Sequence, residues 1–189
     1  MHSNIRCHNH SLLVATLYLW AGLASNAAQA ITINFSASIL QGTCSLSLDK
    51  SVLPLGEVSQ SLLRSGALIN LQPVTLRASN CIGGTGGIQQ PVIAVIGTGH
   101  TQDGKWLFRS DDSDVGGAGV MLVQSAIPPD YGDIEVKTGD AFPLAAIGQA
   151  PVDKELPFYA GISCGGSSGC TTIKPGALTA HIVFNFAYR

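Results

Sequence analysis

The stretch that decides the fold is the end of the chain, Gly176 to Arg189, which reads GALTAHIVFNFAYR. From Ala180 onward the residues alternate, so that one face of the segment would carry Ala180, Ile182, Phe184, Phe186 and Tyr188. A period of two is β-strand geometry, and aromatic and β-branched residues favour it. Chain termini are normally the loosest part of a domain. We therefore expect something to cover this apolar strand.

The composition indicates one ordinary domain behind a leader. The chain has 189 residues, of which 12% are charged and 22 are glycine, and its mean hydropathy is +0.29. This balance fits neither a disordered chain nor a cytosolic helical protein. The formal net charge is −2, and neither sign forms a long run. We therefore expect no nucleic-acid partner, because such binding needs a basic patch.

Residues 1–30 have the pattern of a signal peptide. Arg6 precedes an apolar run from Leu12 to Leu23, and Ala28-Gln29-Ala30 places small residues before a cleavage site. The alternative is a retained membrane anchor, but the run is shorter than the roughly 20 residues that a bilayer span requires. Cleavage after Ala30 would make Ile31 the first residue of an exported chain. The exact cleavage site stays open.

Cleavage would remove Cys7 and leave four cysteines, Cys44, Cys81, Cys164 and Cys170. An even number in an exported chain predicts two disulfides, for which the sequence permits three pairings. The segment from Cys164 to Cys170 is a Gly/Ser linker whose ends meet readily. Its five-residue spacing differs from the CxxC of a redox pair. We expect a structural disulfide there that pins a loop tip.

The first residues after the leader, Ile31 to Ile39, alternate more regularly than any other stretch, with every odd position apolar. Two interpretations are open. The segment is either the first strand of the protein's own sandwich, or a strand that is lent to another molecule.

Between these ends lie several short apolar runs, bounded by Gly, Pro, Asn and Asp turns. The expected strands are 70–81, 91–97, 106–108, 119–123, 134–136 and 155–162, with His100 in a turn. Residues 59–69 have room for one helical turn. Seven to nine short strands without a helical period predict an all-β sandwich.

No group of residues forms a convincing catalytic or metal site. The sequence has no GxSxG nucleophile elbow and no CxxC pair. The acidic loop at Asp111, Asp112 and Asp114 lacks the ligand spacing of a calcium loop. We expect no enzymatic activity, no cofactor and no metal.

The chain resembles the pilin subunits of chaperone-usher fimbriae, close to the minor subunits of type 1-like pili. The resemblance is carried by the leader, the alternating arm that runs into Cys44, and the runs Leu55-Gly56-Glu57-Val58 and Leu76-Arg77-Ala78-Ser79-Asn80-Cys81. It is strongest at the C-terminus, where Tyr188 is penultimate and Gly176 is fourteenth from the end. It covers the whole mature chain and is weakest between residues 97 and 150.

The resemblance implies an incomplete immunoglobulin-like sandwich that lacks its last strand and is completed by a strand from another molecule. Residues 31–43 would be the donor arm and 44–189 the pilin domain, with Ile33, Phe35, Ala37 and Ile39 as donated side chains. Gly176, Ala180, Ile182, Phe184, Phe186 and Tyr188 would form the acceptor edge. Cys44 with Cys81 would be the family disulfide.

The partners that the resemblance implies are a periplasmic chaperone, an outer-membrane usher and neighbouring pilins. The protein would pass through the periplasm to a fimbrium on the bacterial surface and contribute to cell adhesion. The arm departs from the family at Ala37, where glycine is common. It is also short, which points to a minor or adaptor subunit, and the Cys164–Cys170 pair is not a general family feature.

Two alternatives remain at this stage. One is a single-domain tip or adaptor pilin whose loops, near Trp106 or Cys164 to Cys170, bind a host glycan or protein receptor. The other is a self-complete secreted sandwich that packs Ile31 to Ile39 in its own core.

Overall fold

A computed structural model describes residues 42–189. The predicted signal peptide and the predicted donor side chains Ile33, Phe35, Ala37 and Ile39 lie outside the described residues.

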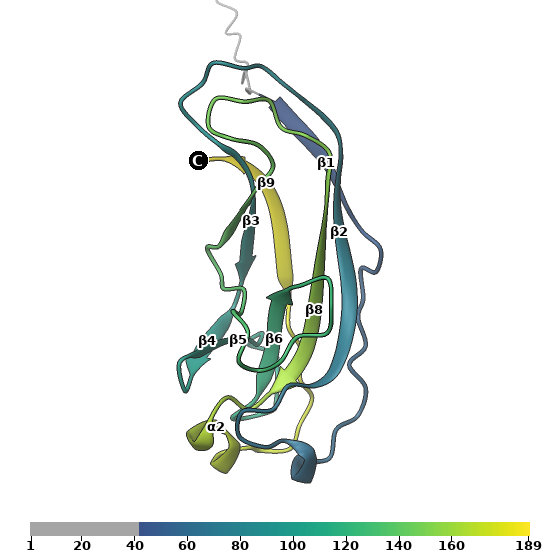
Figure 1. The fold of residues 1–189 in the computed structure, drawn as a ribbon. Helices are drawn as coiled ribbons and strands as arrows, with labels where there is room; N and C mark the ends of the chain where they lie inside the picture. Colours follow the sequence, from purple (N-terminus) through teal and green to yellow (C-terminus); the bar gives the residue numbers. More distant parts are fainter. Residues whose placement is uncertain (1–41) are drawn as a thin grey trace, which may run out of the picture. The chain divides into compact units, whose positions relative to one another are not determined.

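Most of the strands form one six-stranded antiparallel sheet with the order β1-β2-β8-β6-β5-β4. Its members are β1 (Gly42–Leu48), β2 (Ile69–Gly83), β4 (Gly99–Gln102), β5 (Lys105–Phe108), β6 (Gly119–Gln124) and β8 (Lys154–Ser163). The long strands β2 and β8 run side by side through its centre (Figure 1).

The second sheet has three antiparallel strands in the order β7-β3-β9. They are β3 (Pro91–Gly97), β7 (Ala141–Pro143) and β9 (Ile182–Tyr188). The described helical structure is one 3-10 turn, η1 (Gln60–Leu62), and one short helix, α2 (Ser167–Thr171). The prediction of an all-β sandwich is confirmed. No helix within residues 42–189 is long and apolar enough to cross a membrane.

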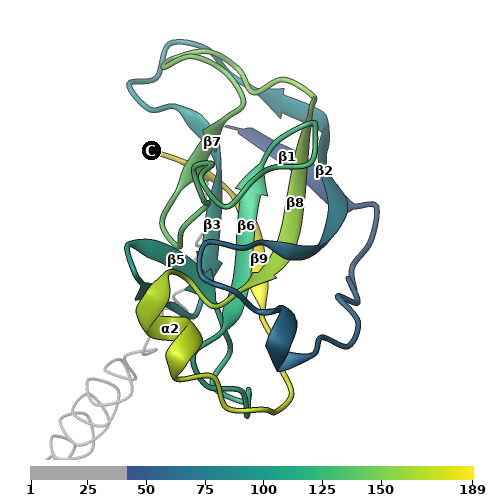
Figure 2. The same ribbon diagram turned by 60° about the horizontal axis from the view of Figure 1, so that its bottom comes forward.

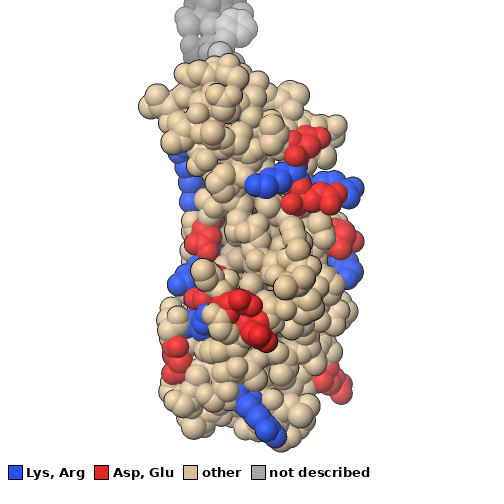
Figure 3. Space-filling model, viewed as in Figure 1, with Lys and Arg blue, Asp and Glu red and all other residues tan. Residues whose placement is uncertain are grey.

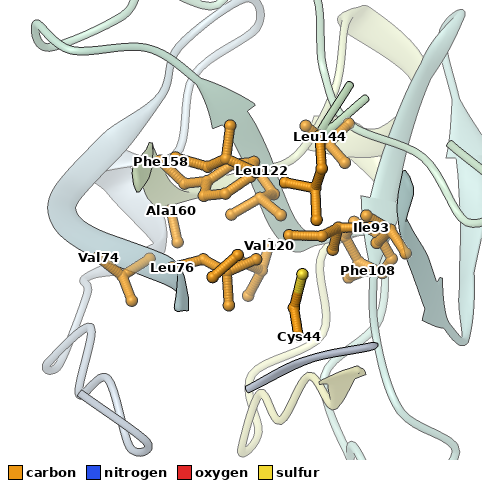
Figure 4. Close-up of a cluster of buried hydrophobic side chains, with 14 residues drawn as sticks. Cys44, Val74, Leu76, Ile93, Phe108, Val120, Leu122, Leu144, Phe158 and Ala160 are labelled. Carbon is orange, nitrogen blue, oxygen red and sulfur yellow. The ribbon is translucent and has the colours of Figure 1, made fainter. Parts of the chain in front are cut away.

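The core lies between the two sheets, because alternate side chains of facing strands point toward each other. Figure 4 shows side chains of β2, β6 and β8 gathered opposite Ile93 of β3. Phe158 of β8 is fully buried and packs edge-on against Phe142 of β7, with ring centroids 5.3 Å apart. The central strand β3 is buried from Pro91 to Val95, as expected for an apolar run covered on both faces.

The prediction of a strand at 134–136 is wrong. The structure has a single bridge there, between Glu135 and Val123. The buried Glu135 carboxylate binds the Lys105 ammonium at 3.2 Å and accepts the backbone N–H of Trp106, also at 3.2 Å. The carboxylate is turned inward toward these half-buried donors and also binds the Lys137 ammonium at 3.2 Å, so these contacts hold the segment against β5.

The predictions for His100 and for the segment between Cys164 and Cys170 need correction, whereas the helical turn expected within residues 59–69 is present. His100, which we expected in a turn, lies in β4, opposite Leu107 of β5. The segment between Cys164 and Cys170 is not only a loop, because it contains the start of α2. The 3-10 turn η1 falls within residues 59–69, where one helical turn was expected.

The connections gather at two ends of the described unit. The helix α2 and the turn η1 lie at one end, and the β2–β3 and β7–β8 loops lie at the other (Figures 1 and 2). The β-strand β1 begins at the second end, because its first residue, Gly42, pairs with Gly83 at the end of β2. We call this second end the Gly42 end.

Candidate functional site: the open edge of the last strand

The strand β9 is paired along one side. Seven consecutive residue pairs join it to β3, from Pro91 opposite Tyr188 to Gly97 opposite Ile182. Among residues 42–189, no strand pairs with its other side. The N–H and C=O groups of an edge strand are available for pairing with another strand. This open edge is therefore the candidate site.

The side chains of β9 alternate between exposed and half-buried, and none is fully buried. His181, Val183 and Asn185 are exposed, whereas Ile182, Phe184 and Phe186 are half-buried. None of the inward-facing residues reaches the full burial of Val95 in β3, the register partner of Phe184. The inward face of β9 thus belongs to the core but is incompletely covered.

Aromatic contacts show how β9 joins that core. The Phe184 ring lies 5.3 Å from the fully buried ring of Phe158. The Phe186 and Tyr188 rings meet edge-to-face with centroids 5.4 Å apart. Rings at such separations attract each other beyond the area that they bury. These side chains are therefore anchored on one side while part of their surface stays accessible.

The other partly buried hydrophobic residues identify the opposite border of the site. Those packed against the main core are Leu46, Leu53, Leu55, Cys81, Trp106, Phe142, Leu178, Ala180, Ile182, Phe184 and Phe186. Eight of these come from only two stretches, Leu46 to Leu55 and Leu178 to Phe186. The first stretch is β1 with the segment after it, and the second is β9 with the segment before it. Incomplete burial of core side chains is concentrated along these two borders.

The two borders approach each other at the Gly42 end. A side chain on Gly42 would collide with the Tyr188 hydroxyl and with the backbone of Ile82. The Tyr188 hydroxyl is buried there, and no hydrogen-bond partner for it lies among the described residues. Glycine at position 42 is thus required by this close approach.

The last strand starts later than its alternation predicts. We expected it from Ala180, but β9 begins at Ile182. The backbone of Thr179 pairs with the loop before it, because Ser110 N–H donates to the Thr179 carbonyl at 2.8 Å and Thr179 N–H donates to the Ser113 hydroxyl at 2.9 Å. Serine hydroxyls commonly take backbone hydrogen bonds in this way.

The loop that contains Ser110 and Ser113 also binds the residue just before β9. His181 N–H donates to the Ser110 hydroxyl at 2.9 Å, so the backbone is tied to side chains immediately before β9 begins. The sequence analysis missed both serines, and loop serines give no pattern by which it could have found them.

Gly176, which the resemblance assigned to the acceptor edge, lies outside β9. It is exposed and precedes the strand by six residues. A Cβ at this position would lie 2.8 Å from the Asp114 carbonyl carbon. Gly176 therefore allows the chain to pass close to the Asp114 loop, and its role at the acceptor edge stays a prediction.

Both disulfides have the pairings that the sequence analysis favoured. Cys44 of β1 is bonded to Cys81 of β2, with 4.1 Å between Cα atoms. Cys164, after β8, is bonded to Cys170 in α2, with 4.9 Å between Cα atoms. The first bond ties the border strand β1 to the centre of its sheet. The second closes the loop at the opposite end of the molecule.

A separate hollow of about 540 Å³ lies where β3 passes into β4, and its lining includes Trp106 and Arg109. Burial, and then the nearby Arg109 charge, lower the pKa of His100, which also borders it. The described residues contain no group of three or more His, Cys, Asp or Glu side chains that could hold a metal ion.

The two sheets define the class of the molecule as an all-β sandwich, in which β1, β4, β7 and β9 are the edge strands among residues 42–189. The β9 edge differs from a fully packed one in that the inward side chains Ile182, Phe184 and Phe186 are only half-buried. No protein-family model matches the chain, and no curated protein matches it. Three solved structures that are similar to it are a pilus rod subunit, a chaperone-usher pilus and a type I fimbria protein.

The P pilus rod subunit PapA is 17% identical, with a TM-score of 0.49 over 84% of this chain and 99% of that chain. A chaperone-usher pilus solved to explain rod uncoiling is 17% identical, with a TM-score of 0.46 over 87% of this chain and 99% of that chain. A Burkholderia pseudomallei antigen and type I fimbria protein is 14% identical, with a TM-score of 0.46 over 78% of this chain and 99% of that chain.

Proposed function

We propose that the protein is a structural subunit of a chaperone-usher pilus, and that a strand from another molecule completes its sandwich along β9. The single observation that supports this most is the open edge itself. Within residues 42–189, β9 pairs with β3 alone, and its inward side chains Phe184 and Phe186 are only half-buried. An extended segment added there would gain backbone hydrogen bonds and cover apolar surface at the same time.

The donated segment in this proposal is the alternating arm Ile31 to Ile39 of a neighbouring subunit. Its apolar residues Ile33, Phe35 and Ile39 stand at every second or fourth position, so they share one face of a strand. That face would meet the half-buried side chains along β9. Ala37, on the same face, would place a methyl where glycine is common in the family.

A subunit with such an edge needs protection before assembly, because an unpaired apolar strand invites aggregation. A periplasmic chaperone that lends a strand would supply this protection, and an outer-membrane usher would exchange it for the arm of the next subunit. The protein then acts by assembly and surface display, as part of an adhesive fimbrium, and not by catalysis. The minor-subunit position predicted from the short arm stays a prediction.

The test compares the chain from Ile31 with a chain that lacks Ile31 to Ile39, each alone and with a peptide of residues 31–41. We expect both chains to have low stability as monomers, and the peptide to raise their melting temperatures by several degrees. A control peptide in which Ile33, Phe35 and Ile39 are serine should have no such effect. If instead the longer chain is a stable monomer and the deletion unfolds it, the arm belongs to its own sandwich and the proposal is wrong.

A further inference from the structure

The Gly42 end carries exposed aliphatic side chains on two loops. Ile88 is 91% exposed, and Ile82, Ile147 and Val152 are each at least 54% exposed. Neither Ile82 to Pro91 nor Pro143 to Val152 contains a charged residue or a histidine. Figure 3 shows no charged side chain at the tip of this end on the face in view, and acidic and basic side chains just below it. Single exposed aliphatic residues are ordinary, but a group of them on two loops without charged residues indicates an interaction surface. Charged residues border this surface: the Asp153 carboxylate accepts the Cys81 N–H at 2.9 Å, and the backbone of Arg189 pairs with Gln90.

These loops are held in place by hydrogen bonds between them. Gly86 N–H donates to the Gly148 carbonyl at 2.8 Å, and Gly148 N–H donates to the Gln89 carbonyl at 3.0 Å. The Gln90 side chain donates to the Ala145 carbonyl at 2.9 Å. Gly148 has a φ of 73°, and a Cβ there would collide with the Gly87 carbonyl oxygen. The exposed side chains are therefore presented by a cross-linked pair of loops.

The loop from Pro143 to Val152 borders a shallow hollow, to which the other loop contributes Gln90. A shallow depression of about 480 Å³ is lined mainly by Pro143, Leu144, Ala145, Ala146 and Val152. Lys154 stands at its border, where its ammonium group donates to the Pro143 carbonyl at 3.0 Å. An apolar side chain of a partner that entered this open depression would contact mainly apolar residues.

The position of this surface identifies its occupant. Thr43, one residue from the start of the described chain, is the register partner of the exposed Ile82. Residues 31–41 therefore connect to the domain directly beside the apolar loops. If these residues are inserted into another subunit, then that subunit is tethered against the Gly42 end, and its effective concentration there is high.

We propose that the apolar loops of the Gly42 end, Ile82 to Pro91 and Pro143 to Val152, are a docking surface for a second copy of this chain, the copy that receives the arm. This inference rests on the proposed function. The docking surface would act together with the inserted strand, so that the junction between subunits is held by a strand and by a packed apolar contact.

The test uses the full chain from Ile31 and measures its self-assembly. The double variant Ile88→Ser and Ile147→Ser should fold and respond to the 31–41 peptide like the wild type, yet dissociate from assemblies about tenfold faster or more. Ile127→Ser is the matched control, because Ile127 is 71% exposed on the β6–β7 connection. A photoreactive residue at position 88 should cross-link two copies, whereas one at position 127 should not.

Each outcome separates the two proposals. If assemblies form but position 88 gives no cross-link between copies and the double variant dissociates at the wild-type rate, the docking surface is wrong and the strand donation stands. A cross-link from position 88 to residues 31–41 of the same molecule would also overturn the docking surface. If the peptide has no effect on the wild type, strand donation fails, and with it the assignment of the docking surface to the copy that receives the arm.

Discussion

At the tip of the β4–β5 hairpin, the Asp103 carboxylate accepts the backbone N–H groups of Ser168 and Gly169, at 3.1 and 3.2 Å, and the Ser168 hydroxyl. It thereby ties the hairpin to the start of α2 and to the loop closed by Cys164 and Cys170. The Ser168 hydroxyl contributes most, followed by the Gly169 N–H, to holding the pKa of Asp103 below its ordinary value. These donors favour the ionised carboxylate.

This arrangement predicts how stability depends on pH. Because the folded-state pKa lies below the unfolded one, the stabilisation is present above about pH 4 and is lost as the pH falls through the folded-state value. In Asp103→Asn this dependence should be absent, so the melting temperatures of variant and wild type should converge as the pH falls from 6 to 3. Asparagine is the appropriate replacement because Asp103 has a φ of 49°, which asparagine tolerates.

The control for this measurement is Asp111→Asn, which removes the same charge from an exposed position. A pH-dependent difference of equal size in this variant would assign the effect to net charge and contradict the role of Asp103.

At the scale of the elements, the long strand β2 contains two register shifts, one against β1 and one against β8. Thr43 and Ser45 of β1 stand opposite Ile82 and Ser79, so β2 has one extra residue beside the Cys44–Cys81 bond. Asn80 lies in this bulge with a φ of 51°. A second register shift, against β8, includes Asn70 with a φ of 53°. Asparagine suits both positions because it tolerates the left-handed conformation.

The bulge predicts a specific pattern of substitution at Asn80. Asn80→Ala should lower the free energy of unfolding by about 1 kcal/mol, since alanine lacks the local stabilisation of the left-handed conformation. Asn80→Gly should remain close to the wild type, because glycine adopts this conformation without steric cost. Urea unfolding of the two variants would measure the difference. Equal losses would show that the side chain of Asn80, and not its backbone conformation, matters.

The sequence predicted well those strands whose bounds follow from the pattern of their own residues. The apolar run at 91–97 is β3 with the same bounds, and the run at 155–162 is β8 with one more residue at each end. The strand β7, Ala141–Pro143, was missed because three residues show no alternation. The wrong strand at 134–136 had a suitable pattern, but the segment meets β6 at a single bridge, between Glu135 and Val123.

At the scale of the whole molecule, the incomplete sandwich predicts different roles for neighbouring residues of β9. Phe184 is half-buried against Phe158, so Phe184→Ala should cost about 2 kcal/mol, less than the loss of a fully buried ring. Val183, which is 49% exposed on the other face, is the control, and Val183→Ala should change the free energy of unfolding by less than about 0.5 kcal/mol.

The variants Phe184→Ala and Val183→Ala should also differ in how much the 31–41 peptide stabilises them. Phe184→Ala should reduce the stabilisation that the peptide gives, because the donated side chains would lose one of the surfaces that they cover. Val183→Ala should retain it. Urea unfolding with and without the peptide measures both effects, and an equal peptide response in the two variants would argue against donation on the Phe184 face.

The sequence by itself determined the alternation of the last strand and the all-β class, whereas the pairing of Cys44 with Cys81 came from the resemblance. It could do so because side-chain period and turn residues are local properties of the chain. Only the tertiary structure decided that β9 pairs with β3 alone among residues 42–189, and that Ser110 and Ser113 delay its start to Ile182. The hydrogen-bond partners of a backbone group come from segments that are distant in sequence, so a local sequence pattern does not predict them.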